Sequence, residues 1–386
     1  MNLLKSLCVA ILFYSPLTHC EVSKEVSSLW RDVVLATHER NYGAVINKIE
    51  SINKNKVLNS SEQNVIDQQL DTVVALAGLY DGRKDAIDID KLVAEHTVMK
   101  ATRFIKELAP QNNIIMINEA HHDPLHRHFT SKLLLPLYKE GFRYFAVEGL
   151  DNEKMNEKGY INPDSGIYTN EPEYAALINY AMKLGFKVMS YDASSDDREI
   201  KSAKNIIKKS LAIDKNAKIL IHCGYGHIKE DKDWLAFELK KLTGINPLTI
   251  NQTDFPRIIN KAKYKETHGI NDGFVLVDKT SRQAYSKKPN QYDFNVFHLS
   301  PQYVNQRPSW YLDEHKTLVF NKAWCKESFP CLIEVERKSY TDAVAFDRYL
   351  LRTDTTEPLT LRVPKTAFYI STYDEHGKLI KKSELN

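Results

Sequence analysis

The chain has 386 residues, of which 42% are hydrophobic and 27% are charged, an ordinary composition for a globular protein with one large or two smaller cores. Its formal net charge of +3 is too balanced to favour nucleic acid or an anionic membrane surface as a partner.

Residues 1–20 resemble a secretory leader. Lys5 supplies a positive start, residues 7–14 form an apolar run too short to cross a bilayer, and Thr18 and Cys20 are the small residues expected before a cleavage site. The segment also resembles a bacterial lipobox, so a lipid anchor at Cys20 is the less favoured alternative. No later stretch reaches the ~18 apolar residues of a membrane helix. We therefore expect an exported protein, periplasmic or secreted by a bacterium, with no transmembrane segment.

Residues 21–110 are predicted to form helices, because apolar side chains such as Val26, Trp30 and Val33 recur three and four residues apart. A break is expected near residues 41–43. The region carries little obvious chemistry, and we interpret it as a helical layer or cap.

Residues 111–285 alternate between apolar, β-branched runs and amphipathic stretches. A strand spacing of about 30 residues favours βαβ units and a mainly parallel sheet flanked by helices, which is an α/β fold. The expected strands are residues 114–118, 143–148, 187–191, 218–223, 247–251 and 273–277, and the expected helices are residues 125–139, 171–184, 199–212 and 231–242.

Residues 286–386 are rich in aromatic and β-branched side chains and predict a small β-rich C-terminal region, with strands at residues 332–335, 359–363 and 368–373. Cys325 and Cys331 are close in sequence and are expected to form a disulfide in an oxidising compartment. Cys223 would then be unpaired.

Four of the expected parallel strands end in polar or special residues. The first runs into Glu119 and His121, the second into Glu148, the third into Asp192, and the fourth into residues 224–227, which read Gly-Tyr-Gly-His. Since the carboxyl ends of parallel strands meet at one edge, where open α/β sheets bind ligands, these side chains are predicted to converge. Converging acids and imidazoles can perform general acid–base chemistry or hold a metal ion.

Each candidate has a predicted role. His121 is the preferred general base or metal ligand, and Glu119 would orient it or share the metal. Glu148 and His227 would handle a second proton transfer or complete a metal site, with Asp192 as a further carboxylate ligand. Two glycines before His227 let the backbone turn sharply and approach a ligand. Plain polar turns and capping carboxylates remain the alternatives.

Three polar residues, His126, Arg127 and His128, lie in the first turns of the helix that follows Pro124. Arg127 is a candidate clamp for a substrate anion, with a solvated charge as the alternative. Cys223 is a candidate nucleophile, although small buried cysteines are common. The sequences typical of zinc peptidases and serine hydrolases, His-Glu-x-x-His and Gly-x-Ser-x-Gly, are absent.

The pattern resembles the superfamily that joins erythromycin-esterase-like hydrolases, ChaN-like haem-binding lipoproteins and TIKI/TraB-type metalloproteases. Glu119 and His121 match its Glu-x-His, Glu148 its second carboxylate, and residues 224–227 its late glycine–histidine turn, while Asn118 stands where the family has glycine. The match covers residues 110–280. The resemblance implies a shared α/β core and a polar pocket at the strand ends, and it leaves the activity open because members differ in it.

Two main functions follow. The first is an exported hydrolase of ester or peptide bonds that acts on a small-molecule or peptide substrate, with or without a divalent metal ion. The second is a haem- or iron-binding periplasmic protein in which Tyr225, His227 or His121 supplies axial ligands. A structural exported protein with a lapsed pocket is a third possibility, which Asn118 keeps open.

Overall fold

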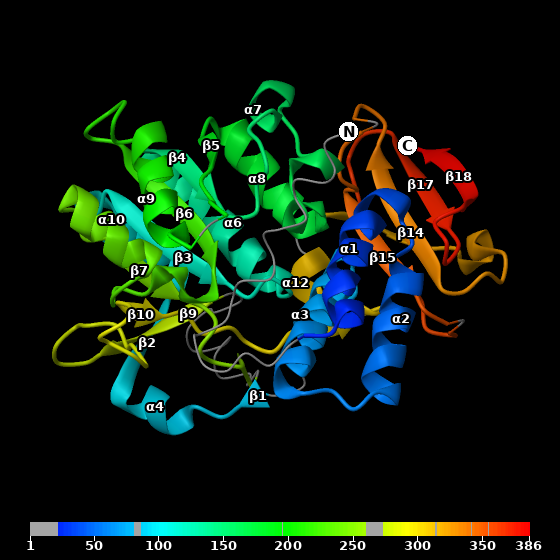
Figure 1. Ribbon diagram of the computed structural model, residues 1–386. Coiled ribbons are helices and arrows are strands. Elements are labelled where there is room, and N and C mark those ends of the chain that lie inside the picture. The colour runs from blue at the N-terminus through cyan, green and yellow to red at the C-terminus, as the bar shows by residue number, and fades with distance from the viewer. Residues whose placement is uncertain are drawn as a thin grey trace. The chain divides into compact units, whose positions relative to one another are not determined.

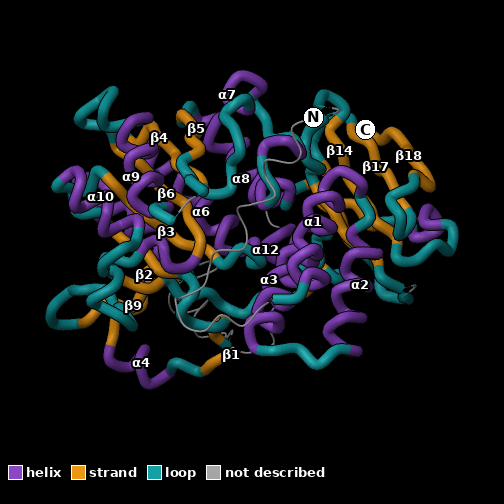
Figure 2. The backbone as a smooth tube through the Cα atoms, in the orientation of Figure 1, coloured by secondary structure: helices purple, strands orange, loops and turns teal. Residues whose placement is uncertain are grey.

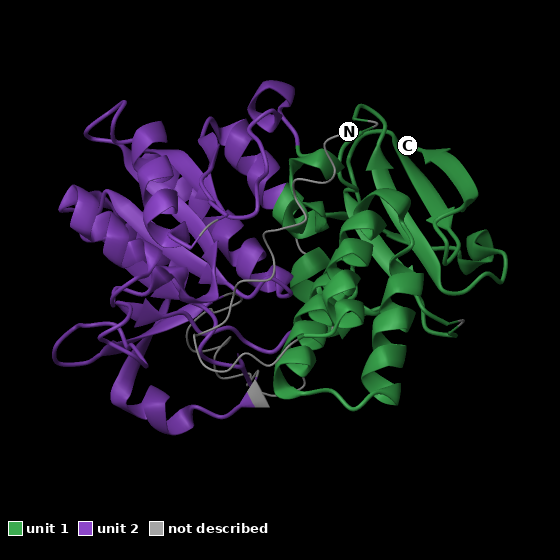
Figure 3. Ribbon diagram, in the orientation of Figure 1, with its two compact units in different colours: residues 1–80, 161–175, 303–386 green, residues 81–160, 176–302 purple. Residues whose placement is uncertain are grey.

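The structure is a computed structural model, and it describes residues 22–80, 86–194, 196–259, 273–312, 315–340, 342–353 and 355–386. The leader predicted at residues 1–20 therefore lies outside the described residues. The chain divides into two compact units (Figure 3): unit 1 contains residues 1–80, 161–175 and 303–386, and unit 2 contains residues 81–160 and 176–302. Among the helices described, none is long and apolar enough to span a bilayer.

The core of unit 2 is a six-stranded parallel sheet, which confirms the predicted α/β fold (Figures 1 and 2). Its strands stand in the order β10-β7-β3-β6-β4-β5. They are β3 (Ile114–Glu119), β4 (Phe142–Val147), β5 (Lys187–Ser190), β6 (Lys218–Gly224), β7 (Leu248–Asn251) and β10 (Phe294–Asn295). All six residues of β3 are buried, as expected for a strand covered on both faces.

Helices cover both faces of this sheet. α9 (Arg198–Lys209) and α10 (Leu235–Thr243) pack their apolar side chains on Ile114, Met116 and Ile219. α6 (Pro124–Lys139) packs against β3 and β4 from the other side (Figure 1). The side chain of Asp123 caps α6 by accepting a hydrogen bond from the amide of Leu125, and Pro124 occupies the first turn. Pro136 lies inside this helix, which continues to Lys139.

Two strands differ from the sequence-based expectation. Residues 96–100, placed in the helical region, form β2 (His96–Lys100), which pairs antiparallel with β9 (Phe274–Asp278). β9 therefore lies outside the six-stranded sheet, and its expected place as the sixth strand is taken by β10. β10 has two residues, too short for any periodicity to mark it. The remaining elements of unit 2 are β1 (Ala86–Ile87), α4 (Asp90–Glu95), α5 (Ala101–Leu108), α7 (Met155–Lys158), α8 (Pro172–Leu184, which begins in unit 1) and β8 (Arg257–Ile258).

In unit 1 three N-terminal helices pack on a C-terminal antiparallel sheet of order β15-β14-β17-β18. The helices are α1 (Lys24–Glu39), α2 (Tyr42–Asn55) and α3 (Ser60–Leu76), and the strands are β14 (Cys331–Arg337), β15 (Asp347–Leu351), β17 (Phe368–Tyr373) and β18 (Leu379–Leu385). The expected break falls at Arg40, which ends α1 with a φ of 59°. The shorter elements are β11 (Tyr303–Val304), β12 (Arg307–Pro308), α12 (Ser309–Leu312), β13 (Lys316–Val319) and β16 (Thr360–Val363).

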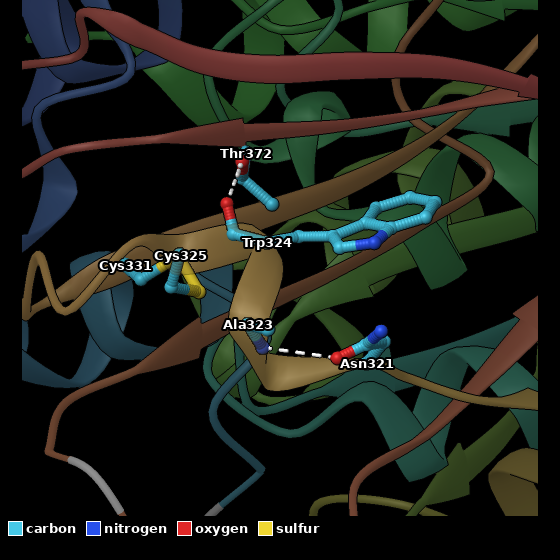
Figure 4. The surroundings of a disulfide bond; sticks show 6 residues. All are labelled: Asn321, Ala323, Trp324, Cys325, Cys331 and Thr372. Atoms are coloured by element: carbon cyan, nitrogen blue, oxygen red, sulfur yellow. Dashed lines mark hydrogen bonds between the residues drawn. A yellow bond between two sulfur atoms is a disulfide. The ribbon is translucent and has the colours of Figure 1, made fainter.

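The predicted disulfide between Cys325 and Cys331 is present (Figure 4). Both cysteines are buried and lie in an apolar cluster with Ile333 and Ile370, on the face of the sheet opposite Leu332, which packs on the helices. Thr372 donates a hydrogen bond to the carbonyl of the adjacent Trp324. Cys223 is free and buried, as expected.

Removing this disulfide is expected to destabilise unit 1. Closing a loop between cysteines six residues apart restricts the unfolded chain and contributes about 2 kcal/mol. The double variant Cys325→Ala/Cys331→Ala should therefore unfold at a lower urea concentration than wild type, by that free energy. An unchanged midpoint would show that the bond contributes nothing to stability.

Candidate functional site

The four strand ends singled out in the sequence are neighbours in the sheet, because β3, β6, β4 and β5 are consecutive in its order. Glu119 ends β3 directly opposite Gly224 of β6, and the amide of Glu148, just past β4, donates to the carbonyl of His222 in β6. The structure therefore brings Glu119, His121, Glu148, Asp192 and His227 to one edge of the sheet.

Glu119 lies at the centre of the first half of the site. Arg127 of α6 donates from Nε to Oε2 at 2.7 Å and from a terminal nitrogen to Oε1 at 2.8 Å. His121 Nδ1 lies 2.9 Å from Oε1, and His222 Nε2 lies 2.9 Å from Oε2. Both carboxylate oxygens are thus saturated, and the bond to Nδ1 fixes the ring of His121.

This environment keeps Glu119 ionised. Burial disfavours the charged form, but Arg127 and His222 outweigh it and hold the pKa of Glu119 well below its usual range. Arg127 is itself buried and points at Glu119, so it serves as a partner of this carboxylate rather than as the predicted anion clamp. A buried pair of this kind holds the His121 loop in one geometry.

The second half of the site is built around Arg198, the first residue of α9. Its guanidinium bonds both oxygens of Asp192 at 2.7 Å and donates to Glu148 Oε1 at 2.8 Å. Glu148 Oε1 also lies 3.5 Å from Nε2 of His227, whose Nδ1 is 2.9 Å from Glu199 Oε2. Arg198 and Glu199 were not singled out from the sequence.

Glu148 and His227 are a coupled ion pair. Burial opposes both charges, but His227, His121 and Arg198 hold the pKa of Glu148 well below its usual range. Burial would likewise lower the pKa of His227, yet Glu148 and Glu199 outweigh it and raise that pKa to about 10. At neutral pH His227 is therefore an imidazolium between two carboxylates.

Nε2 of His227 has a second neighbour, an Arg198 nitrogen at 3.1 Å. Both groups are donors when His227 is protonated, so this contact is a hydrogen bond only in the neutral state. The protonated ring pairs with Glu148 and the neutral ring with Arg198. His227 can therefore lose or regain a proton without losing a partner.

The two halves meet over Gly224. Nε2 of His121 lies 4.0 Å from Glu148 Oε1. A Cβ atom at position 224 would lie 2.4 Å from Nε2 of His121 and 3.2 Å from a carboxylate oxygen of Glu148, so only glycine permits this approach. The Gly224 amide also donates to Glu148. We call Glu119, His121, Glu148, Asp192, Arg198, Glu199, His222 and His227 the acid–imidazole cluster.

A pH dependence of stability follows from His227. Because its folded pKa of about 10 exceeds the ordinary value of 6.5, its stabilising charge is fully present below pH 6.5 and is lost as the pH rises through 10. We expect wild type to exceed His227→Gln in unfolding free energy at pH 6 by more than at pH 10. Urea unfolding of both proteins across that range measures the difference, and a difference independent of pH would contradict the assignment.

The other predicted residues lie beside the cluster. The Tyr225 ring packs edge-on against that of His121 at 5.5 Å, and its hydroxyl lies 3.3 Å from His122 Nδ1. His126 accepts a hydrogen bond from the Ala120 amide, and burial first, then the nearby charge of Arg257, lowers its pKa to about 4. Cys223 faces the apolar core, where burial raises the pKa of its thiol well above the usual value, unlike a nucleophile.

Comparison with known proteins adds little. No family model matches the chain, and no curated protein matches it. A structure titled "Bacterial protein toxins" shares 13% identity over 55% of this chain and 53% of its own, with a TM-score of 0.32. A MARTX toxin effector domain from Vibrio vulnificus shares 12% over 65% and 59%, with a TM-score of 0.29. The type III effector HopBA1 shares 15% over 43% and 91%, with a TM-score of 0.27. The match thus spans about half the length of the bacterial toxin structure. A likeness this distant carries no information about activity.

Proposed function

We propose that this protein is a hydrolase of ester or amide bonds in which His121 is the general base. The observation that carries the proposal is the placement of His121: Nδ1 is held by the ionised Glu119, and Nε2 lies 4.0 Å from Glu148, which is paired with Arg198 and His227. A carboxylate that fixes one ring nitrogen sets the other as the basic atom, as in other acid–base sites.

The base step uses Nε2 of His121. It takes a proton from a water molecule while the water oxygen attacks the substrate carbonyl carbon. The charge on the resulting imidazolium is balanced by Glu119 on one side and Glu148 on the other. The side chain of His121 is 11% exposed, whereas those of Glu119 and His222 are at most 1% exposed. The proposal places the substrate on the solvent side of the His121 ring.

The counterpart of the base is a pair of cations. Arg198, with its side chain 19% exposed, is the accessible guanidinium of the cluster and would stabilise the oxyanion that develops on the carbonyl oxygen. His227, protonated at neutral pH, would deliver a proton to the leaving group as the bond between that group and the carbonyl carbon breaks, and would then pair with Arg198 in its neutral form. The proton taken up by His121 would pass through solvent back to His227 and restore both groups. Asp192 and Glu199 position these two cations.

A divalent metal ion does not fit the donors as they are paired. Both oxygens of Glu119 accept from Arg127 and two imidazoles, and Glu148 is bonded to Arg198. Within the described ranges no group of three or more His, Cys, Asp or Glu side chains is arranged to hold a metal. Two guanidinium groups supply the positive charge here. Metal binding by Glu119, His121, Glu148, Asp192 and His227 stays a prediction, which a chelator tests.

Export is part of the proposal. A disulfide at Cys325 and Cys331 fits an oxidising compartment, in agreement with the leader expected at residues 1–20. Haem binding through Tyr225 or His227 stays the alternative prediction, although both ring nitrogens of His227 already face carboxylates. A haem titration without a Soret shift would remove it.

The test is hydrolysis of a panel of ester, amide and peptide substrates by purified wild type, with and without chelator. We expect cleavage of at least one substrate class, unchanged by chelator, with a rate that depends on His121. Failure to cleave any member, or activity that disappears with chelator, would contradict the mechanism as written.

A further inference from the structure

A cavity adjoins the acid–imidazole cluster in unit 2. It has a volume of about 390 Å³ and lies over the ends of β3 and β7, with Tyr225 and Gly226 as its boundary toward the cluster. Tyr225 both lines this cavity and contacts the ring of His121. We call this space the side cavity. Because this cavity lies next to the cluster, it can hold the part of a substrate that does not react.

The charged side chains around the side cavity are mostly paired with each other. Asp123 is bonded to Arg257, and Asp254 lies 3.1 Å from Lys288. Lys229 differs from them: among the described residues its ammonium has no hydrogen-bond or ion-pair partner, and it lies 4.7 Å from the centre of the Trp234 ring. Within the described part of the chain, Lys229 is thus a lining cation that no carboxylate pairs with, and this favours an anion.

The side cavity is lined in part by aromatic rings, whose faces favour contact with another flat group. Trp234, Phe255 and Tyr292 contribute aromatic side chains to the lining. The Trp234 ring lies close to Gly226, where an added Cβ would be 2.9 Å from it, and packs edge-on against His227 at 5.9 Å. A group bound on Trp234 would thus lie next to the catalytic imidazolium.

Tyr225 lies between the acid–imidazole cluster and the side cavity. Its φ of 37° is a left-handed conformation that is costly for a residue with a side chain. That conformation sets the ring between His121 and the side cavity. Strain retained at such a boundary is typical of functional loops.

We propose that the side cavity binds a flat substrate group that bears a carboxylate, with the carboxylate on Lys229. This rests on the proposed hydrolase function and names its substrate class: esters or amides with an anionic, planar group on one side of the scissile bond.

Binding is tested with phenylacetate and its uncharged isostere phenylacetamide. Trp234 is the one tryptophan in the sequence of unit 2, so its fluorescence reports on the cavity. We expect phenylacetate to bind wild type at least tenfold more tightly than phenylacetamide. Lys229→Met should bring the two within twofold, Lys229→Arg should keep the preference, and Lys215→Met, an exposed lysine before β6, should not alter it. Equal affinity in wild type, or a fluorescence change that survives Trp234→Phe, would overturn the proposal.

Hydrolysis assays test the anion site and the proposed hydrolase function independently. The substrates are 4-nitrophenyl 4-carboxyphenylacetate and its uncharged 4-carbamoyl analogue. A KM at least tenfold lower for the charged ester, lost in Lys229→Met with kcat retained, supports the assignment. Cleavage of both esters with equal KM overturns the inference and leaves the hydrolase intact. Selective phenylacetate binding without any cleavage overturns the hydrolase and leaves the anion site intact.

Discussion

Replacing His121 by alanine is expected to lower kcat by about 10²- to 10⁴-fold, the usual contribution of a general base. The substitution removes the basic nitrogen that faces Glu148 but leaves Glu119 bonded to Arg127 and His222. The fold should therefore persist while the chemistry fails. Initial rates on the best substrate of the panel, with circular dichroism for integrity, measure both effects.

A matched control is His96→Ala. His96 also lies in unit 2, but its Nδ1 bonds the backbone carbonyl of Leu92 at 2.8 Å, away from the cluster. Its loss should change kcat less than twofold. Added imidazole should partly restore the His121 variant, because it replaces the missing base. Full activity in His121→Ala would end the proposed mechanism.

Replacing Arg127 by methionine is expected to lower the free energy of unfolding by about 3–5 kcal/mol, because it leaves a buried carboxylate without its main cation. Arg127 has none of its surface exposed and Glu119 has 1%. Activity should fall as well, since the pKa of Glu119 would rise and its hold on His121 would weaken. Urea unfolding and initial rates measure the two effects.

The double variant Glu119→Gln/Arg127→Met should be more stable than Arg127→Met, because it removes the stranded charge together with its partner. Arg103→Met is the matched control, since Arg103 pairs with Glu107 on an exposed helix surface with 74% of its side chain accessible. That change should stay within about 0.5 kcal/mol. Equal losses of unfolding free energy in Arg127→Met and Arg103→Met would show that the buried pair contributes no more to stability than an exposed one.

Local patterns in the sequence predict the sheet that holds the site. The apolar run of β3 and the Asp123–Pro124 start of α6 each depend on neighbouring residues alone, so strand, turn and helix could all be inferred. In the sheet β6 lies between β3 and β4, so Glu119 and Glu148 reach the same edge on either side of the end of β6. That these strand ends share an edge follows from the rule for parallel strands alone.

Other features depend on contacts between distant residues. β2 forms because His96–Lys100 pairs with β9 almost 180 positions later in the chain, and strand formation of this kind follows tertiary context. In the sequence, Arg198 cannot be told from a cation on the surface of a helix. Its part in the cluster follows only from its contact with Glu148, which is distant in the chain. His222 lies within β6 and binds Glu119 directly, a contact that depends on the pairing of β6 with β3.

The arrangement of the two units constrains how the protein can be shortened. The backbone passes from one unit to the other four times, at residues 80/81, 160/161, 175/176 and 302/303. Deleting residues 1–80 to isolate the unit that carries the candidate site would remove α1–α3 from the C-terminal strands and expose Leu332, Leu350 and Tyr373 to water. A fragment ending at residue 302 would keep residues 161–175 without their partners. Every assay therefore requires the intact chain. A single proteolytic cut would release neither unit, because each unit is built from separate segments of the chain.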